Sequence, residues 1–147
     1  MNTPEDIART ASVHWTGDIA RGRGSITTQS GLVTADYSFG TRFSGDPGTN
    51  PEELLAASHA SCFTMALSLA LTRAGHPPAS IDTQAEVHLH RSAEGFDVSK
   101  IALTTTVVAD GLDQAAFQQL ASGAKAGCPI SKALKAVEIT LAATLKS

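Results

Sequence analysis

The two cysteines of this chain, Cys62 and Cys128, are the residues best suited to do chemistry. Two thiols are too few for a disulfide scaffold and too few for a zinc site built from cysteine alone. They lie far apart in the sequence, so they form no CxxC motif and can meet only through tertiary packing. Two interpretations stay open at this point: a redox-active thiol pair, or two small buried side chains.

The first cysteine falls near the middle of a predicted helix over residues 50–74. Asn50 is a good N-cap, Pro51 suits the first turn, and Gly75 ends the pattern. A cysteine inside a helix is most often a small buried hydrophobe, and an apolar site raises the pKa of a thiol. Cys62 therefore needs a positive group nearby before it can act as a nucleophile.

Three residues could supply or tune such a charge near Cys62. His59 precedes it by three residues on the same helix and could act as a base or a ligand, although a packed histidine is at least as common. Arg42 precedes the Gly- and Pro-rich loop that feeds the helix, a position where arginine is usually exposed to solvent. Glu52 is by default an ordinary acid of the first helical turn.

The second cysteine has a different local setting. Pro129 suits the first position of a new helix, which places Cys128 at the N-cap. The helix dipole favours a thiolate there, so Cys128 has a local reason to ionise that Cys62 lacks. The alternative is a helix junction with an incidental cysteine.

A metal site is not expected. His59 and Cys62 have a helical spacing of three, and His88 and His90 share one face of a predicted strand. No set of three or four ligands has a spacing typical of zinc proteins.

The order of predicted elements indicates an α+β fold with largely antiparallel strand pairing, in a single domain over residues 1–147. Hydrophobic periodicity and turn residues predict strands at 12–15, 24–29, 32–39, 82–90, 96–108 and 137–145, and helices at 50–74, 113–126 and just after Gly127.

Composition narrows the possible partners and location. The net charge of −3 and the pI of about 5.9 give no basic signature for nucleic-acid binding. The first six residues are polar and acidic, unlike a secretory signal, so a cytoplasmic protein is expected. The apolar stretch 54–71 carries polar interruptions and no basic flanks, so we expect a buried helix of a soluble protein and no membrane partner.

Two long motifs around the cysteines carry a family resemblance. Residues 49–63, TNPEELLAASHASCF, closely resemble the first cysteine motif of the OsmC/Ohr family, and residues 124–131, AKAGCPIS, resemble its second. The segments HWTGD at 14–18 and TRF at 41–43 look like the OsmC branch. The similarity extends from about residue 13 to residue 147.

The resemblance implies a thiol-dependent peroxidase that prefers organic hydroperoxides. The implied architecture is an intertwined α+β homodimer with antiparallel sheets around a long central helix. By motif, Cys62 would be the peroxidatic cysteine and Cys128 the resolving one. Arg42 would match the active-site arginine and Glu52 its glutamate partner.

The residue chemistry agrees with that assignment. A thiolate attacks one peroxide oxygen, and the always-charged fork of Arg42 can stabilise the leaving alkoxide. The resulting sulfenic acid on Cys62 is converted by Cys128 to a disulfide, which an external dithiol must reduce. The family suggests a lipoyl-type dithiol. No flavin, haem or metal cofactor is needed, because both redox equivalents reside on sulfur.

Helix geometry adds a constraint on Glu52. Ten residues of helix separate it from Cys62, a rise of about 15 Å, which is too far for direct contact. Either the first turn is displaced from the helix, or Arg42 and Glu52 come from the other subunit. We favour the second route, with the active site at the dimer interface.

The helix around Cys62 also bears apolar residues, which predict an apolar pocket suited to alkyl hydroperoxides: Leu55, Phe63, Met65 and Leu69. Two rival functions remain. One is a non-enzymatic stress-related or small-ligand-binding protein with vestigial cysteines. The other is hydrolase or acyl-transfer chemistry by Cys62 with His59.

Overall fold

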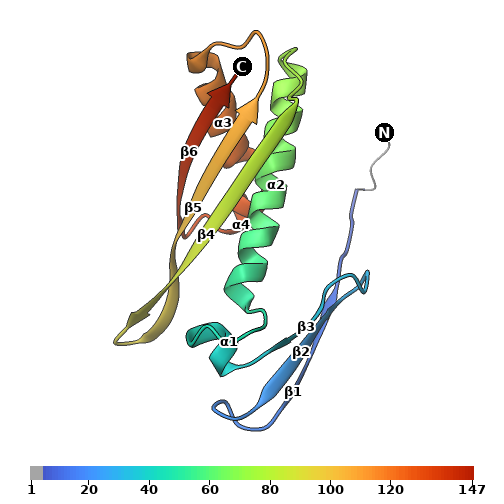
Figure 1. Cartoon of the computed structure of the whole chain (residues 1–147), viewed down its shortest axis with the longest axis vertical. Helices are drawn as coiled ribbons and strands as arrows, with labels where there is room; N and C mark the ends of the chain where they lie inside the picture. Colours follow the sequence, from blue (N-terminus) through green and yellow to red (C-terminus); the bar gives the residue numbers. More distant parts are fainter. Residues whose placement is uncertain (1–4) are drawn as a thin grey trace. The chain divides into compact units, whose positions relative to one another are not determined.

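A computed structural model describes residues 5–147 of the chain. These residues form two compact units, which meet in the sequence between Pro51 and Glu52 (Figure 1). The α+β class predicted from the order of elements is confirmed in both.

The first unit is built on a three-stranded antiparallel sheet. Its strands are β1 (Ala11–Thr16), β2 (Arg23–Thr28) and β3 (Thr34–Tyr37), in that order. Trp15 and Tyr37 flank Gly24 from the two outer strands, with ring centroids 5.5 Å apart. A Cβ atom at Gly24 would collide with both rings, so only glycine fits this central position.

The short helix α1 (Phe39–Phe43) corrects the sequence prediction. We expected a strand over 32–39 and a strand-to-loop setting for Arg42. The strand instead ends at Tyr37, because Ser38 and Thr41 form a reciprocal capping box that starts a helical turn. Arg42 therefore lies on a helix.

The first unit has very little core of its own. Within residues 5–51, Ile26 is the only buried hydrophobic side chain. Large apolar side chains that are exposed in this unit include Val13, Ile19, Leu32 and Phe39. A three-stranded sheet with so little buried apolar surface is marginal by itself.

The second unit packs helices on one three-stranded sheet. Its strands, in their order across the sheet, are β4 (Ser80–Ser92), β5 (Gly95–Val108) and β6 (Glu138–Lys146). Its helices are α2 (Pro51–Arg73), α3 (Gln114–Gly127) and α4 (Pro129–Ala133). Pro51, the first residue of α2, is the last residue of the first unit. β4 and β5 form an antiparallel hairpin, as expected. β5 and β6 are parallel, which the prediction of largely antiparallel pairing did not specify. A parallel pair needs a crossover, and α3 with α4 provides it.

The core of the second unit lies between the sheet and the helices. Alternate residues of β5 point into it, including Ile101, Leu103 and Val107. They meet fully buried residues of the two longer helices: Phe63, Leu67, Leu71, Phe117 and Ala121. Cys128 is part of the same buried cluster. The packing of α2 and α3 on one sheet therefore also fixes the position of the second cysteine.

A chain of three threonines sets α2 against the sheet. Thr64 Oγ1 donates to Thr83 Oγ1 at 2.8 Å, and Thr83 Oγ1 lies 2.9 Å from Thr105 Oγ1. Thr105 is fully buried and donates onward to the carbonyl oxygen of Asp82 at 3.3 Å. Burying a hydroxyl group costs free energy unless the group is hydrogen-bonded. The three linked threonines therefore hold α2 on the sheet close to Cys62.

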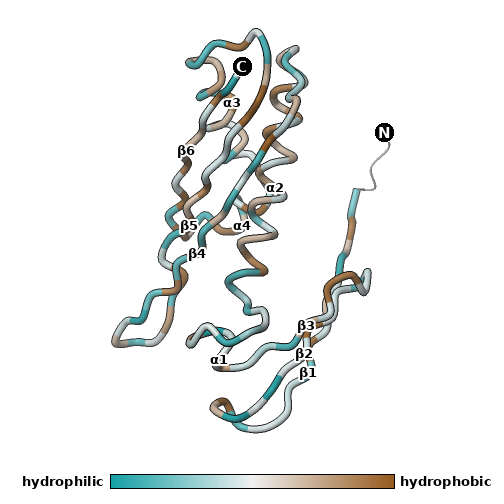
Figure 2. The backbone as a smooth tube through the Cα atoms, viewed as in Figure 1, coloured by the Kyte–Doolittle hydropathy of each residue, from teal (hydrophilic) through white to brown (hydrophobic). Residues whose placement is uncertain are grey.

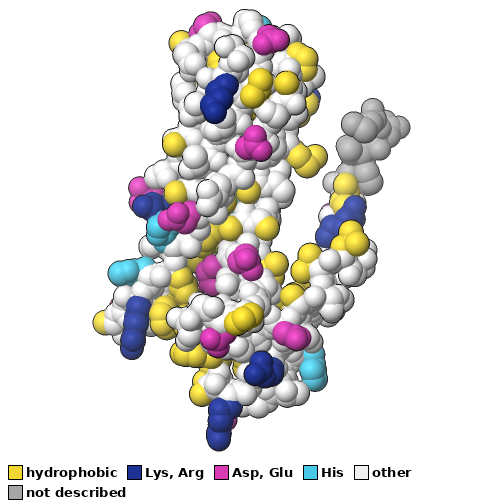
Figure 3. Space-filling view, in the orientation of Figure 1, with side chains coloured by type: hydrophobic (Ala, Val, Ile, Leu, Met, Phe, Trp, Pro, Cys, Tyr) yellow, Lys and Arg dark blue, Asp and Glu magenta, His cyan; other side chains and the backbone are white. Residues whose placement is uncertain are grey.

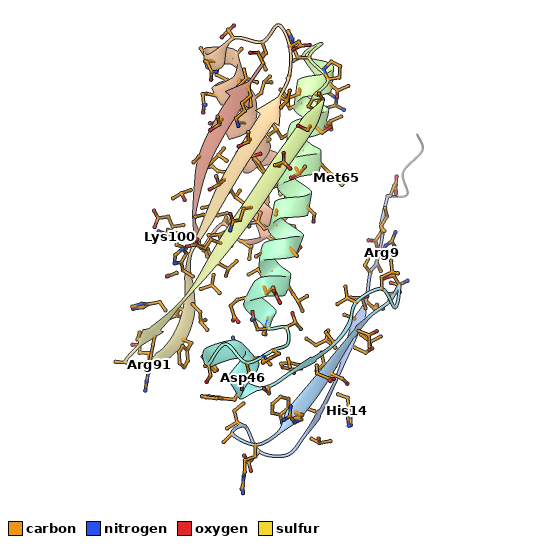
Figure 4. All side chains as sticks on the ribbon, in the orientation of Figure 1. Arg9, His14, Asp46, Met65, Arg91 and Lys100 are labelled. Atoms are coloured by element: carbon orange, nitrogen blue, oxygen red, sulfur yellow. The ribbon has the colours of Figure 1, made fainter. Side chains whose placement is uncertain are left out.

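Only one face of α2 is buried, although we expected a buried helix. His59, Phe63, Leu67 and Leu71 face the core, and Met65 points outward from the helix (Figure 4). By length and composition α2 could cross a membrane, and 22% of its most apolar 18-residue stretch is buried. Core helices of soluble proteins pass the same test. The helix is apolar along much of its length (Figure 2), and hydrophobic side chains reach the surface of the second unit (Figure 3).

The fully buried Leu67 offers a test of this core. Leu67→Ala should lower the free energy of unfolding by about 2–5 kcal/mol, because it leaves a cavity under α2. Urea denaturation measures the loss. Ser122→Ala is the control: Ser122 is exposed on α3, and its truncation should change stability by less than about 0.5 kcal/mol. Equal effects of the two substitutions would contradict this packing.

Candidate active site

The fold brings the two cysteines into contact. Cys62 Sγ, from the middle of α2, lies 2.8 Å from Cys128 Sγ, and both residues are free cysteines. Cys128 ends α3 and begins α4, with Pro129 in the first position of that helix. The sequence prediction that Cys128 occupies a helix start is therefore confirmed, and the two thiols form a pair that can be bridged.

The two sulfurs differ in accessibility. Cys62 is half-buried and lines an apolar groove of about 480 Å³, together with Met65, Ala66, Leu69, Gly127 and Pro129. Cys128 has an exposed fraction of 0%. A molecule held in the groove would therefore meet Cys62 and not Cys128.

The predicted apolar pocket exists, but only half of its predicted residues line it. Met65 and Leu69 do so. Phe63 points into the core of the second unit and is fully buried, and Leu55 packs against that core. Phe63 follows Cys62 by one residue and therefore falls on another face of α2. Leu55 shares the face of Cys62 but lies two turns nearer the start of the helix, about 10 Å away along its axis.

The surroundings of the sulfurs push their pKa values apart. Burial, followed by the hydrogen bond with Cys128, raises the pKa of Cys62. Burial opposes ionisation of Cys128 as well. The polar groups around its sulfur, first the Cys62 thiol and then Ser131 and Ile130, outweigh that burial and lower the pKa of Cys128. In this chain the more acidic sulfur is the buried one.

His59 pairs with Ser131 and not with the Cys62 thiol, which follows it by one helical turn. Its ring is fully buried, its Nε2 lies 2.8 Å from Ser131 Oγ, and its Nδ1 has no hydrogen-bond partner. Burial lowers the pKa of His59, so the ring is neutral near neutral pH. This arrangement gives no support to His59 as the base of a hydrolase that uses Cys62.

Arg42 and Glu52 come from other elements than the two cysteines. Arg42 is on α1 in the first unit, with its guanidinium carbon 5.3 Å from the centroid of the Phe43 ring. Glu52 is in the first turn of α2, so the continuous helix separates it from Cys62 by about 15 Å. A first turn displaced from the helix, one of the two routes considered, is not found. The active-site roles of both residues stay predictions.

Ser131 is the residue at this site that sequence reasoning missed. It follows Cys128 by three residues on α4, is buried, and its Oγ lies 2.8 Å from His59 Nε2. Its position in a helix that starts at a cysteine was a usable signal, since residues three apart share a helix face. Across residues 5–147, no cluster of three or more His, Cys, Asp or Glu side chains could hold a metal ion.

Comparison with known proteins gives a consistent family. The OsmC-like protein family matches residues 43–142 of the chain. The peroxiredoxin OsmC of Escherichia coli strain K12 is 51% identical over 142 residues, which cover 96% of this chain and 99% of that protein. The organic hydroperoxide resistance protein OhrB of Bacillus subtilis is 35% identical over 114 residues, covering 76% and 82% of the two chains.

Solved structures show the same fold. The crystal structure of OhrB of Bacillus subtilis superposes with a TM-score of 0.67 at 31% identity, covering 93% of this chain and 98% of that one. An organic hydroperoxide resistance protein OsmC from Legionella pneumophila superposes with a TM-score of 0.72 at 25% identity, covering 95% and 99%.

The buried, neutral His59 predicts a pH-dependent stability. The unfolded chain binds a proton at this residue below about pH 6.5, and the folded chain does so only at lower pH. Its contribution to stability is therefore complete above pH 6.5 and is lost as the pH falls towards the pKa of the folded state.

The substitution His59→Gln should remove the pH-dependent contribution of His59 to the free energy of unfolding, which amounts to at most about 1.4 kcal/mol for each pH unit. Urea denaturation from pH 7 down to about pH 5 measures it. The control His90→Gln changes an exposed position of β4 and should keep the parent protein's slope of unfolding free energy against pH. An unchanged slope in His59→Gln would show that the buried histidine does not resist protonation.

Proposed function

The chain belongs to the OsmC/Ohr family, in its OsmC branch, and we propose that it is a thiol-dependent peroxidase that reduces organic hydroperoxides to alcohols. One observation carries the proposal. Two thiols from distant parts of the sequence meet at 2.8 Å, with one opening on an apolar groove and the other fully buried. Peroxide reduction followed by disulfide formation needs this combination.

Cys62 is the peroxidatic residue in this proposal. Its thiolate attacks one oxygen of the hydroperoxide, the S–O bond forms as the O–O bond breaks, and the alkoxide takes a proton to become the alcohol. Accessibility supports the assignment, because Cys62 lines the groove and Cys128 does not. The groove is apolar, which favours alkyl and aryl hydroperoxides over hydrogen peroxide.

Cys128 then resolves the sulfenic acid on Cys62. Its sulfur attacks the sulfenic sulfur, the S–S bond forms, and hydroxide leaves and is protonated to water. An external dithiol reduces the disulfide by exchange, and a lipoyl-type dithiol is the class we propose. No flavin, haem or metal is required for this cycle.

Arg42 and Glu52 act on the same reaction in this proposal. Burial raises the pKa of Cys62, so its thiolate needs a cation at the moment of attack. Arg42 supplies that charge and stabilises the alkoxide, and Glu52 orients the guanidinium by a charge-assisted pair. Since Glu52 cannot reach Cys62 along α2, we propose that a second copy of the chain supplies both residues.

A homodimer also accounts for the apolar surface of a single chain. The first unit has one buried hydrophobic residue within the part that the structure describes, and α2 exposes Met65 and Leu69 beside Cys62. Surfaces of this kind are typical of obligate interfaces. We propose that two copies intertwine, that residues 1–147 act as one domain, and that the enzyme works in the cytoplasm in the response to oxidative stress, without a membrane or nucleic-acid partner.

Turnover of cumene hydroperoxide with a dithiol tests the function. The parent protein should consume it faster than hydrogen peroxide, and mass spectrometry should find a Cys62–Cys128 link after one equivalent of peroxide. Cys62→Ser should abolish turnover. Cys128→Ser should lose sustained turnover and accumulate sulfenic acid on Cys62, because the resolving sulfur is gone.

The exposed Ser122→Ala on α3 is the control and should behave like the parent protein. Absence of peroxide consumption and of a disulfide would instead favour a non-enzymatic ligand-binding protein. Full turnover by Cys128→Ser would favour acyl-transfer chemistry.

Mixed dimers test which chain supplies the arginine. When an Arg42→Ala chain is combined with a Cys62→Ser chain, one of the two sites regains Cys62 and a partner's Arg42. About half of the parent activity should return, and each variant alone should be inactive. A mixed dimer that stays inactive would mean that Arg42 acts on Cys62 of its own chain.

A further inference from the structure

The short helix α4 begins at Cys128, and its position decides whether that sulfur meets Cys62. The helix spans only Pro129–Ala133, and its N-cap makes no side-chain hydrogen bond. The longer helices have polar ties to the sheet. Threonine hydroxyls join α2 to it, and three side chains of α3 donate to carbonyl oxygens of β6: Gln114, Gln118 and Lys125. Within residues 5–147, no side chain of α4 makes such a bond to the sheet.

The polar tie of α4 is a contact between Ser131 and His59 of α2. Ser131 Oγ lies 2.8 Å from His59 Nε2, and both side chains are more than nine-tenths buried. In the described part of the chain, it is the only side-chain hydrogen bond that links α4 to another element. Ile130 and Leu134 also pack on the core, but apolar packing is not directional and sets no single position along α2.

This contact lies one helical turn from the thiol pair on both helices. His59 precedes Cys62 by three residues on α2, and Ser131 follows Cys128 by three residues at the start of α4. Residues three apart share a helix face. The contact of the two sulfurs and the contact of imidazole with hydroxyl are therefore neighbouring cross-links between the same two elements. A slide of α4 along α2 that separates the sulfurs would also break the hydrogen bond.

Burial sets the direction of this hydrogen bond. Nδ1 of His59 is buried and has no hydrogen-bond partner. A hydrogen on Nδ1 would be a buried donor without an acceptor, which is rarer and costlier in proteins than an acceptor without a donor. The neutral ring therefore carries its hydrogen on Nε2 and donates it to Ser131 Oγ.

We propose that the hydrogen bond between His59 and Ser131 holds α4 at the position along α2 from which Cys128 can bridge to Cys62. Both are positioning residues, because they act through the placement of the second sulfur. This inference rests on the proposed peroxidase function and deepens it, since it names the residues that prepare the resolving step.

The resolving step depends on this placement. After peroxide reduction Cys62 carries a sulfenic acid, and the Cys128 sulfur attacks it: the S–S bond forms, the S–O bond breaks, and hydroxide leaves and is protonated to water. Such an attack is faster when the two groups are held in reacting geometry. A loosened α4 would leave the sulfenic acid open to a second hydroperoxide, which oxidises it to sulfinic acid.

Thiol–disulfide equilibrium measures the placement without any peroxidase activity. Dithiothreitol is the reference: as it reduces the Cys62–Cys128 disulfide to two thiols, its own two thiols form a cyclic disulfide. Ser131→Ala should lower the equilibrium constant for the protein disulfide about fivefold, because a loosened α4 must be ordered before the bridge closes. The exposed Ser122→Ala on α3 is the control and should match the parent protein.

A role limited to fold stability predicts a different result. It would weaken the reduced and the oxidised protein equally, so the free energy of unfolding would fall and the disulfide equilibrium constant would stay the same. An unchanged constant in Ser131→Ala therefore overturns the proposal.

Substitutions at His59 provide a matched pair. The amide nitrogen of glutamine lies as many bonds from its Cα as Nε2 of histidine does, so His59→Gln keeps a donor for Ser131. His59→Leu removes the donor. The leucine variant should lower the equilibrium constant about fivefold, and the glutamine variant should stay closer to the parent value. If Ser131→Ala does not fold, equal constants for these two variants overturn the proposal.

The double variant with His59→Leu and Ser131→Ala tests whether the two residues act as one unit. It should lose no more than either single variant, because each substitution removes the same hydrogen bond. Losses that multiply in the double variant would show independent roles and overturn the proposal.

Hydrogen exchange locates the effect in α4. The backbone N–H of Lys132 donates to the carbonyl oxygen of Cys128 at 3.1 Å, and that of Leu134 donates to Ile130 at 3.0 Å. In reduced Ser131→Ala these amides should exchange about fivefold faster than in the reduced parent protein. After disulfide formation the two proteins should exchange alike, because the covalent bond then holds α4. Equal exchange in the two reduced proteins overturns the proposal.

Single-turnover kinetics separates this inference from the proposed function. With one equivalent of cumene hydroperoxide, Ser131→Ala should form sulfenic acid on Cys62 at the parent rate and form the disulfide about fivefold more slowly. Equal slowing of both steps overturns the inference. A parent protein that consumes no hydroperoxide would refute the peroxidase proposal, and the dithiothreitol equilibrium would still decide the role of Ser131.

Discussion

The contact between the two sulfurs depends on how α2 packs against the junction of α3 and α4. Neither cysteine has a partner within its own local motif, so the 2.8 Å distance exists only because three elements meet at one point. Phe63, one residue after Cys62, is fully buried in the core and anchors the helix at that level. The redox pair is thus a direct product of core packing, and forces that stabilise the fold also bring the sulfurs together.

The same packing makes the two sulfurs chemically unequal. Cys62 lies at the edge of the core and opens on a groove, whereas Cys128 is enclosed at the start of α4. Burial raises the pKa of the Cys62 thiol, and the pKa of Cys128 is lowered against its own burial by the neighbouring Cys62 thiol. The structure therefore separates access to substrate from ease of ionisation, and it assigns them to different residues.

The exposed apolar surface gives a physical reason for assembly. α2 is apolar along most of its length, yet within one chain only one of its faces is buried. The side chains left exposed beside Cys62, Met65 and Leu69, also line the groove proposed for the hydroperoxide. Covering this face with a second copy would remove apolar surface from water and would also limit the access of water to the reacting sulfur.

Most of the elements and the identity of the cysteine pair could be predicted from local sequence patterns. Asn50, Pro51 and Gly75 mark the ends of a helix by local backbone chemistry, and alternation marks the strands, so these predictions agree with the structure to within a few residues. The cysteine motifs are long enough to indicate the family from sequence, and the family model confirms it.

Which residues meet depends on long-range packing, which local sequence patterns do not encode. The distance between the sulfurs, the contact of His59 with Ser131 and the parallel pairing of β5 with β6 all join segments far apart in the chain, where periodicity carries no information. The helix at Arg42 escaped prediction because a capping box of two residues outweighed a weak strand pattern. Likewise Phe63 and Met65 are equally apolar in sequence, and only packing places one in the core and the other beside the groove.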